Sequence, residues 1–481
     1  MTYNDGYLVP GAGVPSEPWP VEVIEPATGS VLAAYQGGGA ADARKAVEIA
    51  AAALPGWSGT PAPPRAAALV AIAARLREPA IAEELAVLTA RETGKRLAEA
   101  RAEVGMSAGF CEWFAAAIQN RTTGVLRVVP GIEHEVTEQP LGVVAVSTPW
   151  NFPLSIPARK IAAALAAGCT VLFKPSEVAA GSALRFARIV AEHVPDGVLC
   201  TMLGDGAEVT EAWLDDPRVR GISFTGSTRV GLLVAERARA QLTRCVLELG
   251  GNAPFVMLDD ADPAQAVELV NGAKYRNNGQ SCIAANTMWV PRDRLDEVVE
   301  RLVATAGELV LGDPLSAGTT LGPLTLPTDP ARVDELAAEA ANVSKAVYTA
   351  DVAVPEQGHF ARPVIVVDPD RESRIVTEES FAPVLPVLPY DHIGEVLAAT
   401  RDNALGLAGY VVTGDPGRGR RVAAMLDVGI AGVNTATPNT PQVPFGGRKL
   451  SGLGWEGGQA GLDAFLAPQT IAVAVAGERE V

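Results

Sequence analysis

The sequence predicts an α/β protein with two regions of alternating strands and helices and a small third element of β-structure. From residue 142 onward, short runs rich in valine, isoleucine and leucine alternate with longer segments of helical periodicity. Such alternation is typical of a parallel sheet with right-handed crossovers, which is a doubly wound fold. The 481 residues exceed one domain of roughly 100–200 residues. Residues 122–137 alternate with a period of two, which indicates additional strands.

The first 120 residues are expected to be mostly helical. Alanine, valine and isoleucine recur there at helical spacing, and proline and glycine separate the segments. The predicted helices cover residues 41–54, 63–77, 80–89 and 96–120.

The next region, from 142 to 249, carries the doubly wound pattern. Strands are predicted at 142–146, 170–173, 199–203, 221–224 and 245–249, with helices at 161–167, 183–193 and 229–239. Ligands of such sheets bind beyond the carboxyl ends of the strands. The motifs at 148–151, 174–177 and 224–227 each follow a predicted strand, so a binding site is expected at this edge.

A second α/β region begins near Asn252. Its predicted strands are 255–258, 287–290, 362–367 and 386–388, and its predicted helices are 263–275 and 295–309. The alternating segment 122–137 is expected to pair with the tail at 470–476.

Composition argues against several classes of partner. The chain has 39 Lys and Arg against 56 Asp and Glu, a formal net charge of −17, which would repel nucleic acid and acidic membranes. The longest nearly uncharged apolar stretch, 161–173, is shorter than the ~20 residues of a membrane span. No signal peptide is seen at the N-terminus, so a cytoplasmic location is expected.

The cysteines predict neither a disulfide framework nor a metal site. The five cysteines are widely spaced, and CxxC, HExxH and clustered Cys/His motifs are missing from the sequence. Four of them lie in apolar runs, whereas Cys282 follows the polar run Asn-Asn-Gly-Gln-Ser. A reducing compartment and a reactive role for Cys282 alone are therefore expected.

Three residues together suggest covalent chemistry on a carbonyl group. Cys282 would supply a thiolate, Glu248 in Leu-Glu-Leu-Gly-Gly would be a general base, and Asn151 in Thr-Pro-Trp-Asn-Phe-Pro would donate to an oxyanion. Each residue alone is weak evidence, because most cysteines and glutamates in an arbitrary chain have structural or solvated roles.

Taken in the order in which they occur along the chain, these motifs resemble the aldehyde dehydrogenase superfamily, and the resemblance extends from about residue 21 to 470. The resemblance implies NAD(P)-dependent oxidation of an aldehyde to an acid through a thiohemiacetal and a thioester, with Cys282, Glu248 and Asn151 as catalytic residues. It also implies an NAD-binding domain (1–121 and 138–249), a catalytic domain (250–445) and an oligomerisation element (122–137 and 460–481). Relatives are dimers or tetramers, so a homodimer or homotetramer is expected.

The resemblance also implies a cofactor site. Glu177 would accept hydrogen bonds from the adenosine ribose and repel a 2′-phosphate, which favours NAD, while Ser176 leaves NADP open. The helix after Phe224 would present its N-terminus to the pyrophosphate. The predicted cofactor residues are Pro149, Trp150, Lys174, Ser176, Glu177, Gly226, Ser227, Leu249, Glu379 and Phe381.

Two arginines narrow the predicted substrate. Arg159 and Arg276 occupy positions like those that bind the distal carboxylate in the succinate-semialdehyde dehydrogenase branch, and guanidinium groups clamp carboxylates well. Thr440, in the loop 435–442, is expected to add a hydroxyl. Either arginine could instead form a structural salt bridge. Glutarate semialdehyde, another aldehyde, or a CoA-acylating reaction remain the alternatives.

Two further motifs are rejected as binding or catalytic signatures. Gly452–Gly457 fits GxGxxG but does not follow a predicted strand. Gly105–Gly109 fits GxSxG but lies within a predicted helix.

Overall fold

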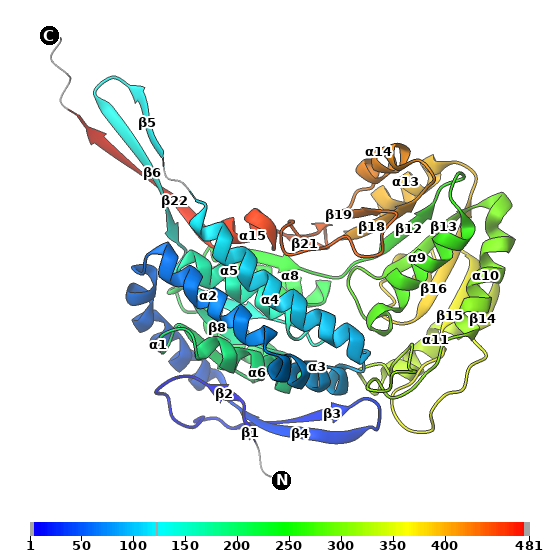
Figure 1. Cartoon of the computed structure of the whole chain (residues 1–481), viewed down its shortest axis with the longest axis horizontal. Helices are drawn as coiled ribbons and strands as arrows, with labels where there is room; N and C mark the ends of the chain where they lie inside the picture. The colour runs from blue at the N-terminus through cyan, green and yellow to red at the C-terminus, as the bar shows by residue number, and fades with distance from the viewer. Residues whose placement is uncertain (1–3, 122–123, 476–481) are drawn as a thin grey trace.

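The computed structural model describes residues 4–121 and 124–475, which form two α/β lobes and a projecting β arm (Figure 1). Each lobe is built on a seven-stranded sheet. Residues that end or follow β7, β10 and β11 of the first sheet line one cavity together with Cys282, Glu379 and Phe381 of the second lobe. Within the described residues, the structure holds no helix long and apolar enough to cross a membrane.

The first sheet is doubly wound, as predicted. Its five central strands are parallel in the order β9-β8-β7-β10-β11, with a short antiparallel strand at each edge. In spatial order the strands are β2 (Tyr7–Leu8), β9 (Leu199–Met202), β8 (Thr170–Lys174), β7 (Val143–Ser147), β10 (Val219–Thr225), β11 (Arg244–Glu248) and β21 (Gly452–Leu453).

Helices cover both faces of this sheet (Figure 1). Helix α5 is buried from Ile156 to Ala167, because it packs between the sheet and the N-terminal helices. The helices are α1 (Ala40–Ser58), α2 (Ala62–Arg77), α3 (Pro79–Thr93), α4 (Leu97–Gln119), α5 (Ser155–Ala167), α6 (Ala180–Ala191), α7 (Gly206–Leu214), α8 (Thr228–Arg239) and α15 (Gly458–Asp463).

The prediction of a mostly helical N-terminal region is wrong for its first part. Strands β1 (Asn4–Asp5), β3 (Trp19–Glu25) and β4 (Ser30–Gly37) form a three-stranded sheet before α1. Val21 and Val23 are buried while Glu22 between them is exposed, which is strand periodicity. The strands were missed because this alternating run is short and because the alanine-rich helices that follow it dominate the composition of the first 120 residues.

The second lobe contains a mostly parallel sheet with one antiparallel edge strand, β14. In spatial order its strands are β14 (Ser344–Thr349), β15 (Val364–Pro369), β16 (Val384–Tyr390), β13 (Ala285–Pro291), β12 (Ala253–Met257), β18 (Ala408–Val412) and β19 (Ile430–Val433). Its helices are α9 (Pro263–Tyr275), α10 (Leu295–Gly307), α11 (Asp329–Ala341), α12 (Arg374–Thr377), α13 (Ile393–Asp402) and α14 (Pro416–Met425). A two-stranded pair, β17 (Leu405–Gly406) with β20 (Arg448–Lys449), lies beside it.

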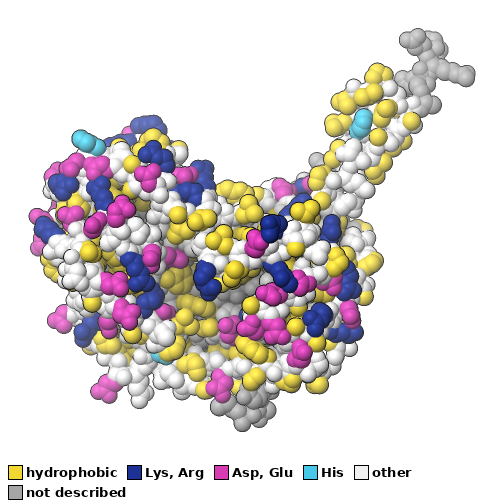
Figure 2. All heavy atoms as spheres, turned by 180° about the vertical axis from the view of Figure 1, so that it is seen from behind, with side chains coloured by type: hydrophobic (Ala, Val, Ile, Leu, Met, Phe, Trp, Pro, Cys, Tyr) yellow, Lys and Arg dark blue, Asp and Glu magenta, His cyan; other side chains and the backbone are white. Residues whose placement is uncertain are grey.

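The arm consists of β5 (Gly124–Val129), β6 (Ile132–Pro140) and β22 (Leu466–Ala474). Strand β22 pairs antiparallel with β6 from Leu466 opposite Pro140 to Ala474 opposite Ile132, so the predicted pairing of the tail is confirmed where it is described. The predicted oligomerisation element also includes residues 122–123 and 476–481, which lie outside the described residues. Figure 2 shows apolar side chains along the arm. They include the exposed Val125, Leu126, Val128, Val129, Ile471 and Val473.

Candidate active site

The loop that carries Cys282 is shaped by left-handed backbone. Asn277, Asn278 and Gly279 have φ of 51°, 58° and 82°, so the chain turns sharply after α9 and brings Cys282 towards the first lobe. A Cβ at Gly279 would lie 2.5 Å from the backbone of Ala382, so this position requires glycine.

Cys282 lies at the boundary between two cavities. One, of about 160 Å³, is lined by Arg159, Arg276 and Phe152 among others. The other, of about 230 Å³, is lined by Asn151 and Glu248. Cys282 contributes to the lining of both cavities, so it lies between them. The structure therefore brings the three predicted catalytic residues together.

Glu248 ends strand β11 and is almost fully buried. Burial raises the pKa of Glu248 to about 7, a change that Glu456 reinforces and Arg159 opposes. Neither carboxylate oxygen has a hydrogen bond of standard geometry within the described part of the chain. The Cys282 thiol is nevertheless close enough for the two groups to shift each other's pKa. Burial, followed by the charge of Glu248, raises the pKa of Cys282, so the resting thiol is protonated.

Asn151 follows strand β7 in the turn that leads into α5. Its Nδ2 donates to the carbonyl of Gln280 at 3.2 Å, and its Oδ1 is buried without a partner among the described residues. Its own backbone carbonyl accepts from Nδ2 of Asn277 at 3.0 Å and from Nζ of Lys95 at 2.7 Å. The amide is thus fixed beside the cysteine loop and keeps one N–H for a further acceptor.

The cavity beside Glu248 lies at the carboxyl edge of the first sheet, where one end of a dinucleotide could bind. Ser227 caps helix α8, whose N-terminus opens at this edge of the sheet. A Cβ at Gly250 would lie 3.0 Å from Oε2 of Glu379, so glycine keeps the space open in front of that carboxylate. Seven predicted cofactor residues line this cavity: Pro149, Trp150, Gly226, Ser227, Leu249, Glu379 and Phe381.

The other three predicted cofactor residues lie at the end of the neighbouring strand, β8, and are not part of that lining. Lys174 is buried, and its Nζ is 3.1 Å from Oε2 of Glu177, whose side chain is 47% exposed. Ser176, which lies between these two residues in the sequence, is also buried. They share the carboxyl edge of the first sheet, where an extended ligand could reach them.

The two predicted substrate arginines have different surroundings. Arg159 is buried, its Nε lies 2.7 Å from Oε2 of Glu456, and its guanidinium lies over the ring of Phe445 at 4.1 Å. The alternative of a structural salt bridge therefore applies to Arg159, although it still lines the smaller cavity. Arg276 forms no ion pair with any residue that the structure describes, so its charge is available to a ligand.

Thr440 does not reach this cavity. It is exposed, and the neighbouring Asn439 contributes to the lining instead. The loop 435–442 has no regular secondary structure, so the direction of its side chains could not be deduced from a period.

Several residues of the site were missed by the sequence reasoning. Lys160 and Ser223 donate to Glu456, which forms a buried charged cluster behind Glu248 together with Arg159. Glu456 lies in the Gly452–Gly457 run rejected above, which forms the edge strand β21 and the turn after it. The only available signal was its position inside a glycine-rich run, which does not identify a charge partner.

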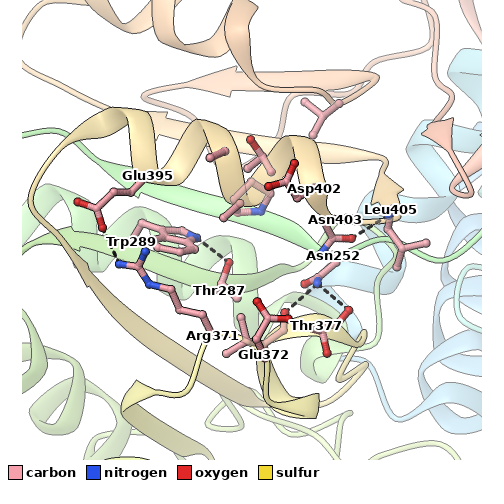
Figure 3. Close-up of a pocket in the computed structure, with 16 residues that line it drawn as sticks. Asn252, Thr287, Trp289, Arg371, Glu372, Thr377, Glu395, Asp402, Asn403 and Leu405 are labelled. Atoms are coloured by element: carbon pink, nitrogen blue, oxygen red, sulfur yellow. Dashed lines mark hydrogen bonds and ion pairs between the residues drawn. The ribbon is translucent and has the colours of Figure 1, made fainter.

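A larger cavity of about 450 Å³ lies in the second lobe (Figure 3). It contains none of the predicted site residues, and its Arg371 is already bonded to Glu395 at 2.8 Å. Asn252 on its wall donates to the carbonyls of Val376 and Thr377. It is larger than either cavity beside Cys282, but Cys282, Glu248 and Asn151 all lie at the two smaller cavities.

Comparisons with known proteins agree with this geometry. The chain is 38% identical over 460 residues to glutarate-semialdehyde dehydrogenase of Pseudomonas putida, covering 95% of this chain and 94% of that protein. It is 38% identical over 451 residues to an NADP(+) succinate-semialdehyde dehydrogenase of Escherichia coli, covering 93% and 92%. The crystal structure of betaine aldehyde dehydrogenase from Staphylococcus aureus in complex with NAD+ superposes with a TM-score of 0.93, at 30% identity over 98% of this chain and 95% of that one.

The match to the family itself spans residues 14–471. Together with the relatives above, it shows that this chain is an NAD(P)-dependent oxidoreductase that belongs to the aldehyde dehydrogenase family.

Proposed function

We propose that the protein oxidises an aldehyde with a distal carboxylate, succinate semialdehyde first, with NAD preferred as the oxidant. The observation that carries this proposal is the position of Cys282 between two cavities, one of which is lined by Arg276, a cation without an ion pair to the described residues. The aldehyde would reach the sulfur from the side of Arg276, and the dinucleotide from the side of Glu248.

The proposed chemistry begins with transfer of the thiol proton of Cys282 to Glu248, whose raised pKa suits a base near neutral pH. The sulfur then forms a C–S bond with the aldehyde carbon. The remaining N–H of Asn151 Nδ2 and a backbone N–H hold the oxyanion. Oxidation of this adduct leaves a thioester on Cys282. After the first proton has left Glu248, the carboxylate takes a proton from water as it attacks, and the C–S bond breaks to release the acid.

The cofactor would be held by the residues that line the cavity beside Glu248 and by Lys174, Ser176 and Glu177 at the end of β8. A bound dinucleotide supplies the hydride acceptor. The half-exposed carboxylate of Glu177 would accept from ribose hydroxyls and repel a 2′-phosphate, which supports NAD over NADP.

The charges around the smaller cavity support a carboxylate substrate. Lys95 is paired with Glu103, Glu99 with Arg96, and Arg159 with Glu456. Arg276 is then the cation left for the ligand, with Arg159 offering its remaining N–H groups. Glutarate semialdehyde is the second candidate substrate, because the relatives above include one enzyme named for glutarate semialdehyde and one named for succinate semialdehyde.

The decisive experiment is an NADH-production panel over two- to eight-carbon aldehydes, with and without a terminal carboxylate and with and without CoA. Succinate or glutarate semialdehyde should have the highest kcat/KM, without dependence on CoA. Cys282→Ala should abolish turnover and still bind NAD. Preference for neutral aldehydes, or turnover by the alanine variant, would disprove the proposal.

We also propose that the protein is a cytoplasmic homodimer or homotetramer. The oligomerisation element (122–137 and 460–481) would be separate from the NAD-binding part (1–121 and 138–249) and the catalytic part (250–445). The proposed oligomer is supported by the exposed apolar side chains of the arm, because exposed apolar patches of this kind often mark protein–protein interfaces.

A further inference from the structure

Three segments of the candidate site meet at one buried ammonium group. Lys95 follows Gly94, which ends α3 in a left-handed conformation with φ of 77°. The side chain of Lys95 is 1% exposed, and its Nζ forms an ion pair with Glu103. The same Nζ donates to the carbonyl of Asn151 at 2.7 Å and lies 4.1 Å from the ring centroid of Phe152. Two of these contacts, with Asn151 and Phe152, are made to the turn that carries Asn151, and the third joins the cation to helix α4.

Glu103 completes the support from the other end of that turn. Its Oε1 accepts from the backbone N–H of Leu154 at 2.9 Å and of Ser155 at 3.1 Å, where α5 begins. Leu154, at the N-cap position of this helix, has no oxygen side chain of its own to accept these donors. The Lys95–Glu103 pair thus holds both ends of residues 151–155.

A buried ion pair is an inefficient way to stabilise a fold, because desolvation of both charges offsets their attraction. Apolar residues of similar size would fill the same volume at no electrostatic cost. Lys95 and Glu103 both line the smaller cavity beside Cys282, close to the position proposed for the substrate. The location argues that the pair fixes the geometry of the site.

We propose that Lys95 is a positioning residue that acts through Asn151, with Glu103 as its partner. The inference rests on the proposed oxyanion role of Asn151. Without Lys95, the one donor that remains to the carbonyl of Asn151 among the described residues is Asn277, so the turn can shift relative to the sulfur. A displacement of about 1 Å at such a position can cost roughly 100-fold in rate.

The test is a double-mutant cycle of Lys95→Met and Asn151→Ala, measured as the rate of the pre-steady-state NADH burst. Lys95→Met should slow the burst roughly 10- to 100-fold and leave the Kd for NAD within about twofold. In the Asn151→Ala background the same change should have little further effect, because the group that Lys95 positions is gone. The pair variant Lys95→Met/Glu103→Gln removes both charges and keeps an acceptor oxygen at position 103, in case the single variant does not fold.

Arg65→Met is the matched control. Arg65 is another buried cation, and its Nε holds the opposite end of α5 through the carbonyl of Ala166 at 3.0 Å. It should lower thermal stability and leave the burst rate unchanged. Equal slowing by Lys95→Met in both backgrounds, or an unchanged burst in the pair variant, would overturn the inference. A full burst in Asn151→Ala alone would instead refute the oxyanion role in the proposed function.

Discussion

Arg276→Met provides the sharpest test of substrate recognition, because methionine keeps the apolar stem and removes the charge. Arg276 is the cation in the smaller cavity without an ion pair to the described residues, so the variant leaves no buried carboxylate unpaired. A hydrogen bond to a charged group contributes about 1.5–3 kcal/mol. The expected loss in kcat/KM for succinate semialdehyde is therefore about 10- to 150-fold, at 1.4 kcal/mol per factor of ten.

The assay compares succinate semialdehyde with butanal, which has the same chain length and no carboxylate. Arg276→Met should change kcat/KM for butanal by less than about threefold, since a neutral aldehyde makes no charged hydrogen bond. Arg159→Met is the control, because it breaks the pair with Glu456 beside the general base and should impair both substrates. Equal losses on both aldehydes in Arg276→Met would refute the reasoning.

Three other variants test separate parts of the site. Glu248→Gln should keep the NADH burst with a slower first phase, and it should slow steady-state turnover most. Turnover of the wild type should rise as the pH increases through about 7, because Glu248 then loses its proton. If the pH–rate profile of the variant still shows that rise, Glu248 is not the base. Glu177→Ser should lower the KM for NADP roughly five- to tenfold by removing one like charge, and an unchanged NADP/NAD ratio in initial-rate kinetics would contradict its role. Val128→Glu should reduce the subunit number measured by sedimentation equilibrium, whereas Val70→Glu on α2, which is 52% exposed, should not.

Short local motifs were enough to select Cys282, Glu248 and Asn151, which the structure brings together at two adjoining cavities, while their catalytic roles stay predictions. The alternation of strands and helices likewise predicted that the first sheet is parallel and doubly wound, but not the spatial order of its strands. Helix α9 was predicted with its observed bounds, since Pro263 marks its start and the apolar period continues to Tyr275. These features depend on residues close together in the sequence.

The remaining features depend on contacts between distant residues. Glu456 meets Lys160 across 296 positions, and no local pattern reveals that separation. The same applies to Arg159, whose type suggested a ligand but whose partner is Glu456. The prediction for Thr440 failed for a different reason. The loop around it is irregular, and its neighbour Asn439 lines the cavity instead.

The sulfur between two cavities also has a pharmacological consequence. A covalent aldehyde mimic that enters past Arg276 need not displace the dinucleotide, so saturating NAD should not protect the enzyme from it. Selective trapping agents could therefore be built entirely on the carboxylate side, where they would be independent of the abundant nucleotide that all such oxidoreductases share.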